Sequence, residues 1–152
     1  CSKNLGLYRE RTGATVFVGK TRDSAEILAS QAMKAARKMY SMPPAHGAIL
    51  AGMVLSDAEL AASWRQELAA MCSRINELRA LLDEKLSAAS GQDFGFIRRE
   101  KGMFSFLGLQ GAQVDRLREE LSVYMVGSSR INVAGVNLSN IDYLATAVAK
   151  VL

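Results

Sequence analysis

The sequence is poor in the residues that build metal centres and covalent scaffolds. Its 152 residues include two cysteines, one histidine and two prolines. Cys1 and Cys72 lie far apart and lack the close spacing of zinc ligands, so we expect two reduced thiols, no metal site and no disulfide framework. The two prolines and twelve glycines also exclude fibrous and low-complexity chains.

Long hydrophobic runs are absent as well. The longest apolar stretch, residues 47–55, is far shorter than the roughly 20 residues that cross a bilayer as a helix. We interpret this stretch as a buried helix, and we expect no membrane partner. The first residue is Cys1 and not methionine, which favours a piece of a longer protein.

Neither sign of charge is concentrated in one region. The net charge is +4, and the 19 lysines and arginines are interspersed with 15 acidic residues. The densest basic cluster, residues 98–102, is interpreted as a solvated turn. Because binding to a phosphate backbone needs clustered positive charge, we expect no nucleic-acid partner.

Hydrophobic residues make up 49% of the chain, which is enough for a globular domain with its own core. Apolar residues at helical spacing predict helices at 21–40, 56–89, 112–121 and from 139 or 140 onward. Ser56, followed three residues later by Glu59, fits a capping box at the start of the second. Apolar runs rich in β-branched and aromatic residues predict strands at 14–18, 123–126 and 131–133, and a hairpin of 94–97 with 103–107. This alternation indicates an α/β or α+β sandwich.

The segment 2–13, SKNLGLYRERTG, contains the residue types of a pyridoxal-phosphate site. Lys3 can condense with an aldehyde cofactor, be displaced by a substrate amine and then shuttle a proton. Arg11 can bind a phosphate through two parallel hydrogen bonds. For both side chains to share one ligand the segment must fold back, and Gly6 and Gly13 supply the backbone freedom for that.

Arg130 directly precedes the apolar residues of the expected strand at 131–133. A buried arginine needs an anion, because an unpaired buried charge is costly. Both a bound ligand and a carboxylate of the same domain would satisfy it. His46, the only histidine, is interpreted as a helix-start or loop residue without a partner and not as a general base.

Four segments, taken together, resemble one enzyme family in its own order along the chain: residues 2–13, 40–47, 102–106 and 129–135. Nearly the whole chain is similar to the C-terminal part of class I pyridoxal-phosphate aminotransferases, in the aspartate and aromatic amino-acid branch. The resemblance implies an α/β fold: the C-terminal small domain of a fold-type-I enzyme, with helices packed on a small sheet, plus the last strand and the lysine loop of the large domain. The implied domain ranges are 1–40 and 41–152.

The same resemblance implies roles for four residues. Lys3 would be the catalytic lysine that binds pyridoxal 5′-phosphate covalently, and Arg11 would bind the cofactor phosphate. Arg130 would bind the α-carboxylate of the substrate, and Phe104 would form a wall on the substrate side. No metal ligand is implied.

The resemblance also implies a function for the parent protein. It would be a cytoplasmic or mitochondrial homodimer that transfers an amino group between an L-amino acid, aspartate or aromatic, and a 2-oxo acid. The isolated chain is expected to be inactive. Two alternatives stay open: a folded fragment without catalytic function, and another fold-type-I enzyme such as a lyase or decarboxylase.

Overall fold

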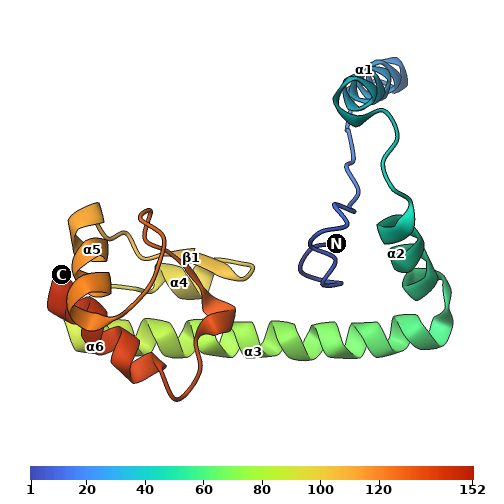
Figure 1. Ribbon diagram of the computed structural model, residues 1–152. Coiled ribbons are helices and arrows are strands. Elements are labelled where there is room, and N and C mark those ends of the chain that lie inside the picture. The colour runs from blue at the N-terminus through green and yellow to red at the C-terminus, as the bar shows by residue number, and fades with distance from the viewer. The chain divides into compact units, whose positions relative to one another are not determined.

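A computed structural model describes all 152 residues of the chain. The chain forms two compact units, Cys1–Leu68 (unit 1) and Ala69–Leu152 (unit 2). The elements, coloured along the chain in Figure 1, are α1 (Arg22–Tyr40), α2 (His46–Ser56), α3 (Ala58–Ser90), α4 (Phe96–Arg99), β1 (Phe104–Phe106), α5 (Gly111–Leu121), β2 (Arg130–Asn132), the 3-10 turn η1 (Val133–Gly135) and α6 (Ile141–Val151).

The first predicted helix, residues 21–40, is confirmed as α1. The Thr21 side chain accepts a hydrogen bond from the Ser24 amide, and the Thr21 amide donates to the Ser24 hydroxyl, which completes a capping box. The helix ends at Tyr40, and Ser41 adopts a positive φ of 59° shortly before Pro43. Proline disfavours helix in the residue before it, which fits this end.

The apolar stretch 47–55 is helical, as predicted, but it is not a buried helix. Within α2 only Gly47 and Ala51 are buried, whereas Ile49 and Met53 are exposed. Gly47 packs against residues 10–12, so one side of α2 is covered inside unit 1. Leu50 and Val54 are partly covered, whereas Ile49, Met53 and Leu55 stay exposed.

The predicted strand at 14–18 is wrong. Its residues form no strand, and Val16 and Val18 are 83% and 89% exposed. A strand is held by hydrogen bonds to a neighbouring strand. The two strands of the structure, β1 and β2, pair with each other, so residues 14–18 have the composition of a strand without its partner.

The long helix α3 has 33 residues and ends at Ser90, close to the predicted end at 89. Its predicted cap is wrong by one residue. Ser56 is the last residue of α2, and the Asp57 carboxylate instead accepts hydrogen bonds from the amides of Glu59 and Leu60, both at 2.9 Å. Aspartate, like serine, is a preferred N-cap, and here the preceding helix occupies Ser56.

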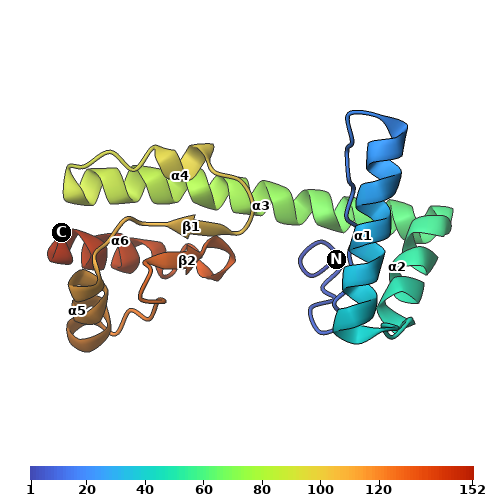
Figure 2. The same ribbon diagram turned by 90° about the horizontal axis from the view of Figure 1, so that it is seen from above.

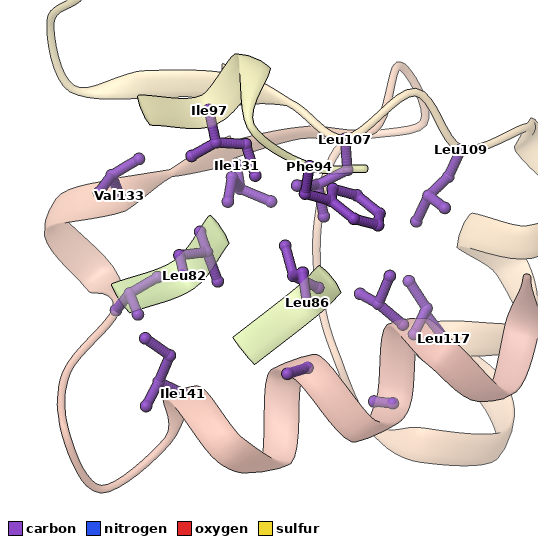
Figure 3. Packing of buried hydrophobic residues seen from close by; sticks show 14 of the residues in the cluster. Leu82, Leu86, Phe94, Ile97, Leu107, Leu109, Leu117, Ile131, Val133 and Ile141 are labelled. Carbon is purple, nitrogen blue, oxygen red and sulfur yellow. The ribbon is translucent and has the colours of Figure 1, made fainter. Parts of the chain in front are cut away.

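Unit 2 contains the hydrophobic core. Figure 3 shows side chains from α4, β2, α5 and α6 gathered around Leu82 and Leu86 of α3, both of which are fully buried. The other buried members are Leu78, Phe94, Ile97, Leu107, Leu109, Val114, Leu117, Ile131, Val133, Val136, Ile141, Ala145, Ala147, Val148 and Val151. The last part of the predicted α3 stripe, Leu78, Leu82 and Leu86, is buried in the same core as Ile131 of the small sheet. Leu60 and Met71 of the same stripe are 47% and 46% exposed, so that part of the prediction is wrong.

The predicted hairpin of 94–97 with 103–107 is wrong. Residues 96–99 form the short helix α4, and β1 pairs in antiparallel fashion with β2, with Ser105 opposite Ile131 and Phe106 opposite Arg130 (Figure 2). The predicted strand at 131–133 is found one residue earlier, and residues 123–126 form no strand. The basic cluster 98–102 is partly helical and not a simple turn.

Helices α5 and α6 confirm the last two predicted helices. Val114 and Leu117 of α5 are buried, while Leu121 is only partly covered. Asn140 occupies the N-cap of α6, although its side chain makes no capping hydrogen bond there. The Asn137 carboxamide oxygen instead accepts from the amides of Ser139 and Asn140.

The chain is thus a mostly helical α/β structure with a two-stranded sheet, which agrees with the predicted class. The boundary between the two units falls within α3 and not at residue 40. The predicted domain ranges 1–40 and 41–152, which concern the parent protein, stay a prediction. None of the helices combines the length and the apolar character that a membrane span requires.

Candidate functional site

Residues 1–12 of unit 1, which we call the lysine loop, close on themselves. The backbone nitrogen of Cys1 donates a hydrogen bond of 2.7 Å to the Thr12 carbonyl, and the Cys1 carbonyl accepts from the Leu7 amide at 3.1 Å. Gly6 has a φ of 67°, a left-handed conformation that suits glycine. The loop therefore folds back, as a ligand shared by Lys3 and Arg11 requires.

Lys3 and Arg11 both contact Tyr8 of this loop. The Lys3 ammonium lies 5.1 Å from the centroid of the Tyr8 ring, and the Arg11 guanidinium donates a hydrogen bond of 3.2 Å to the Tyr8 carbonyl. Both side chains belong to exposed residues. A primary amine and a guanidinium are thereby carried by one small closed loop.

The N-terminus of α2 holds the lysine loop from one side. His46 Nδ1 lies 3.2 Å from a carboxylate oxygen of Glu10, so the expectation of a histidine without a partner is wrong. Gly47, the next residue, is buried against Glu10 and Thr12, and a Cβ at this position would overlap the Thr12 hydroxyl and come to 2.5 Å from the Glu10 Cβ. The segment 40–47 thus acts as a support for the loop that carries Lys3.

Replacement of Gly47 by alanine is expected to destabilise unit 1. The added methyl group must push residues 10–12 away, and overpacking of this kind costs about 1–3 kcal/mol. Urea unfolding of the complete protein measures the loss. Gly52→Ala is the matched control, because nothing lies within 4 Å of a Cβ built there and the same helix carries it. An equal loss in both variants would contradict the proposed contact.

Arg130 and Phe104 meet in unit 2, at the antiparallel pair of β1 and β2. The Arg130 guanidinium carbon lies 4.8 Å from the centroid of the Phe104 ring, a cation–π contact. Both residues line a pocket of about 540 Å³. Its other walls are Ser122, Val123, Tyr124, Met125, Val126, Ile131, Asn132, Gly135, Val136, Asn140, Tyr143 and Leu144.

Arg130 is not buried, contrary to the expectation from its place before an apolar strand. It is an exposed residue that forms none of the eight ion pairs in the structure, so the structural salt bridge considered as an alternative is absent. Ser129, just before it, is buried at a φ of 61°, and its hydroxyl accepts from the Gly108 amide at 3.1 Å. The pocket therefore presents a guanidinium that can pair with an external anion.

A buried arginine of α3, Arg79, is a residue that the sequence analysis missed. Its exposed fraction is 1%, and its guanidinium binds residues of the segment that leads into β1. A signal existed in the sequence, since Arg79 lies four residues after Ile75 and next to Leu78, on the apolar stripe of the helix. A charged residue on such a stripe indicates a buried polar network.

The four predicted site residues therefore form two pairs: Lys3 with Arg11 in unit 1, and Phe104 with Arg130 in unit 2. No group of three or more histidine, cysteine, aspartate and glutamate side chains is arranged to hold a metal ion. The arrangement thus offers an amine and a guanidinium on the lysine loop, and a second guanidinium beside an aromatic ring at the pocket.

Comparison with known proteins identifies the family to which the chain is similar. Residues 1–148 match the profile of the family described as "Aminotransferase class I and II". The aspartate aminotransferase of Haemophilus influenzae is 45% identical over 99% of this chain, and the aromatic-amino-acid aminotransferase of Pseudomonas aeruginosa is 43% identical over the same share. The chain spans 38% of the length of each relative.

The fold agrees with this match. The crystal structure of the aromatic-amino-acid aminotransferase of Burkholderia pseudomallei, covalently bound to pyridoxal phosphate, has a TM-score of 0.83 and 47% identity, over 99% of this chain and 38% of that one. A profile match over nearly all residues and a common fold at this identity lead to one conclusion: the chain belongs to the class I and II aminotransferase family.

Proposed function

We propose that this chain is the C-terminal portion of an aminotransferase that moves an amino group between an L-amino acid and a 2-oxo acid. The observation that carries the proposal is the Arg130 guanidinium, exposed, without a carboxylate partner and 4.8 Å above the Phe104 ring at a pocket of about 540 Å³. Amino and oxo acids share a carboxylate, which such a guanidinium binds through two parallel hydrogen bonds.

The lysine loop fits pyridoxal 5′-phosphate, the cofactor of the solved Burkholderia relative. Lys3 would hold its aldehyde carbon and Arg11 its phosphate, and both side chains contact Tyr8 of the same loop. When bound, this cofactor supplies an electron sink that stabilises negative charge at the substrate Cα.

The residues of the chain supply the remaining steps. The Lys3 amine would take the proton from the substrate Cα and would donate this proton again while the amino group is transferred. Arg130 would bind the substrate carboxylate and Phe104 would form one wall of the pocket, which restricts the orientation of the substrate. Because the carboxylate is clamped and not released, this arrangement favours amino transfer over decarboxylation.

The substrate class is proposed as aspartate or aromatic amino acids. Relatives named for aspartate and for aromatic amino acids match the chain at 45% and 43% identity, so the proposal covers both. We also propose a homodimer and a cytoplasmic location, with a mitochondrial one as the alternative, on the strength of the family resemblance. The proposed partners are small-molecule amino and oxo acids, without nucleic acid or membrane.

The proposal is tested with the complete protein, loaded with pyridoxal phosphate. It is incubated with ¹⁵N-labelled aspartate, tyrosine or phenylalanine and with an unlabelled 2-oxo acid, and mass spectrometry follows the label. We expect the label in the amino acid formed from the acceptor. Release of carbon dioxide or of ammonia without labelled product would instead indicate a decarboxylase or a lyase.

The 152 residues expressed alone are expected to transfer no label, since they span 38% of the length of their relatives. Substantial turnover by this piece would contradict the proposal that the site needs the rest of the protein.

A further inference from the structure

The Arg79 side chain forms more hydrogen bonds than any other side chain of unit 2. Its Nη2 donates to the carbonyls of Gly102 and Phe104, both at 2.7 Å, and its Nη1 donates to the Ser105 hydroxyl at 2.6 Å and to the Ile97 carbonyl at 2.9 Å. Its Nε donates to Gly102 as well, at 3.2 Å. One side chain of α3 thus holds the end of α4 and the start of β1.

The charge of Arg79 is compensated locally. The Glu100 carboxylate lies 3.3 Å from Nη1, and the Ser105 hydroxyl donates to the same carboxylate oxygen at 2.6 Å. No buried side-chain polar atom of the structure lacks a hydrogen-bond partner. A buried and fully satisfied network of this kind has one low-energy arrangement, because a displaced partner leaves a buried charge unpaired.

The segment that Arg79 binds is also held from the side of β2, where the Met103 carbonyl accepts a hydrogen bond of 2.8 Å from the Val133 amide and Ser105 is fully buried. The sheet has two strands, so only one edge of β1 is paired with a strand. On the helix side, Phe104 is held through its carbonyl by Arg79. Gly102, two residues earlier, has a φ of 83°, and its carbonyl is bound by the same guanidinium.

β1 carries Phe104, one wall of the pocket, and pairs with β2, which carries Arg130. The Phe104 ring contacts the Arg130 guanidinium, and the backbone of Arg130 lies opposite Phe106 in the same ladder. A displacement of β1 therefore moves the ring under Arg130 and the strand that carries Arg130 together.

We propose that Arg79 is a positioning residue for the carboxylate site. It acts through the Phe104 carbonyl and the Ser105 hydroxyl, which hold β1 so that Phe104 supports the Arg130 guanidinium in the pocket. This inference rests on the proposed function, in which Arg130 binds the substrate carboxylate. Arg79 itself does not touch the substrate.

A double-mutant cycle in the complete protein tests the inference. Arg79→Met, Arg130→Ala and the double variant are compared with the unmodified protein by the KM and kcat for the amino-acid substrate. We expect Arg79→Met to raise KM roughly tenfold to a hundredfold with a smaller change in kcat, because small misplacements of a binding group have effects of this size. In the Arg130→Ala background, Arg79→Met is expected to have little further effect on KM.

The matched control is Arg98→Met. Arg98 also ties α4 to α3, through Asp83 at 3.1 Å and the Ala80 carbonyl at 3.2 Å, but it makes no contact with β1. It should leave KM unchanged. Ser105→Ala, which removes one acceptor of Arg79, replaces Arg79→Met in the cycle if that variant does not fold. A smaller rise in KM, again lost in the Arg130→Ala background, is expected.

Amide hydrogen exchange supplies a readout apart from activity. Arg79→Met should speed exchange in residues 103–107 and 130–132 and leave α6 unchanged. Three results would overturn the inference. Arg79→Met could leave KM unchanged, it could raise KM just as much in the Arg130→Ala background, or Arg98→Met could raise KM equally. If the unmodified protein transfers no amino group, the proposed function fails instead, and an unchanged exchange rate would then overturn the role of Arg79 independently.

Discussion

Replacing Lys3 by alanine is expected to reduce transamination by the complete protein roughly 10⁴-fold or more. The variant loses both the amine that binds the cofactor covalently and the group that carries the Cα proton, and a positioned acid–base group alone contributes about 10²–10⁴-fold. The absorption band of the lysine-bound cofactor near the visible edge should disappear. Stopped assays with labelled amino acid and an absorption spectrum of the purified variant measure both effects.

Two controls separate this effect from a loss of folding. Lys20→Ala removes another exposed lysine of unit 1 and should preserve both the band and the activity. Circular dichroism of Lys3→Ala should match that of the unmodified protein, because Lys3 is an exposed residue of a loop held mainly by backbone hydrogen bonds. If the absorption band survives in Lys3→Ala, a different lysine binds the cofactor.

The second large effect is expected for Arg130→Ala. Hydrogen bonds to a charged group contribute about 1.5–3 kcal/mol each, so loss of a two-pronged carboxylate contact lowers kcat/KM by about 10²–10⁴-fold. Cofactor content should stay unchanged, since Lys3 and Arg11 are the proposed cofactor residues and Arg130 is proposed to bind the substrate carboxylate instead. Steady-state kinetics with the preferred amino acid and a spectrum of the bound cofactor provide the measurement.

Arg130→Lys tests the geometry of the contact. Lysine keeps the positive charge but loses the planar fork, so we expect activity between that of the unmodified protein and that of Arg130→Ala. Arg116→Ala is the control for loss of an exposed arginine, because Arg116 pairs with Glu120 on α5 and lies outside the pocket. An Arg130→Ala variant with normal kcat/KM would show that the carboxylate is bound elsewhere.

Helices followed from local sequence more reliably than strands. The helical stripe of α3 and the proline signal after α1 depend on residues within a few positions of one another, and both predictions are confirmed. The N-cap of α3 is Asp57 and not the predicted Ser56. Both adjacent polar residues can serve as caps, but Ser56 belongs to the last turn of α2.

Strand pairing could not be predicted from local sequence in the same way. The sequence places residues 94–97 close to 103–107, which favours a hairpin, yet β1 pairs with β2 more than 20 residues away. In the structure Arg79, and not a second strand of a hairpin, binds the carbonyls of Ile97, Gly102 and Phe104. The partners of this segment are therefore far away in the sequence, where local patterns do not indicate them.

The sequence by itself determined the longer helices and the family, because residue types and their spacing specify these directly. Lys3, Arg11, Phe104 and Arg130 stand out as candidates from their motifs alone. Only the tertiary structure decided which strands pair, that His46 and Gly47 support the lysine loop, and that a buried Arg79 holds β1 beneath Arg130. The physical reason is that these contacts join residues far apart in the chain, and each depends on burial and on partners that local spacing does not reveal.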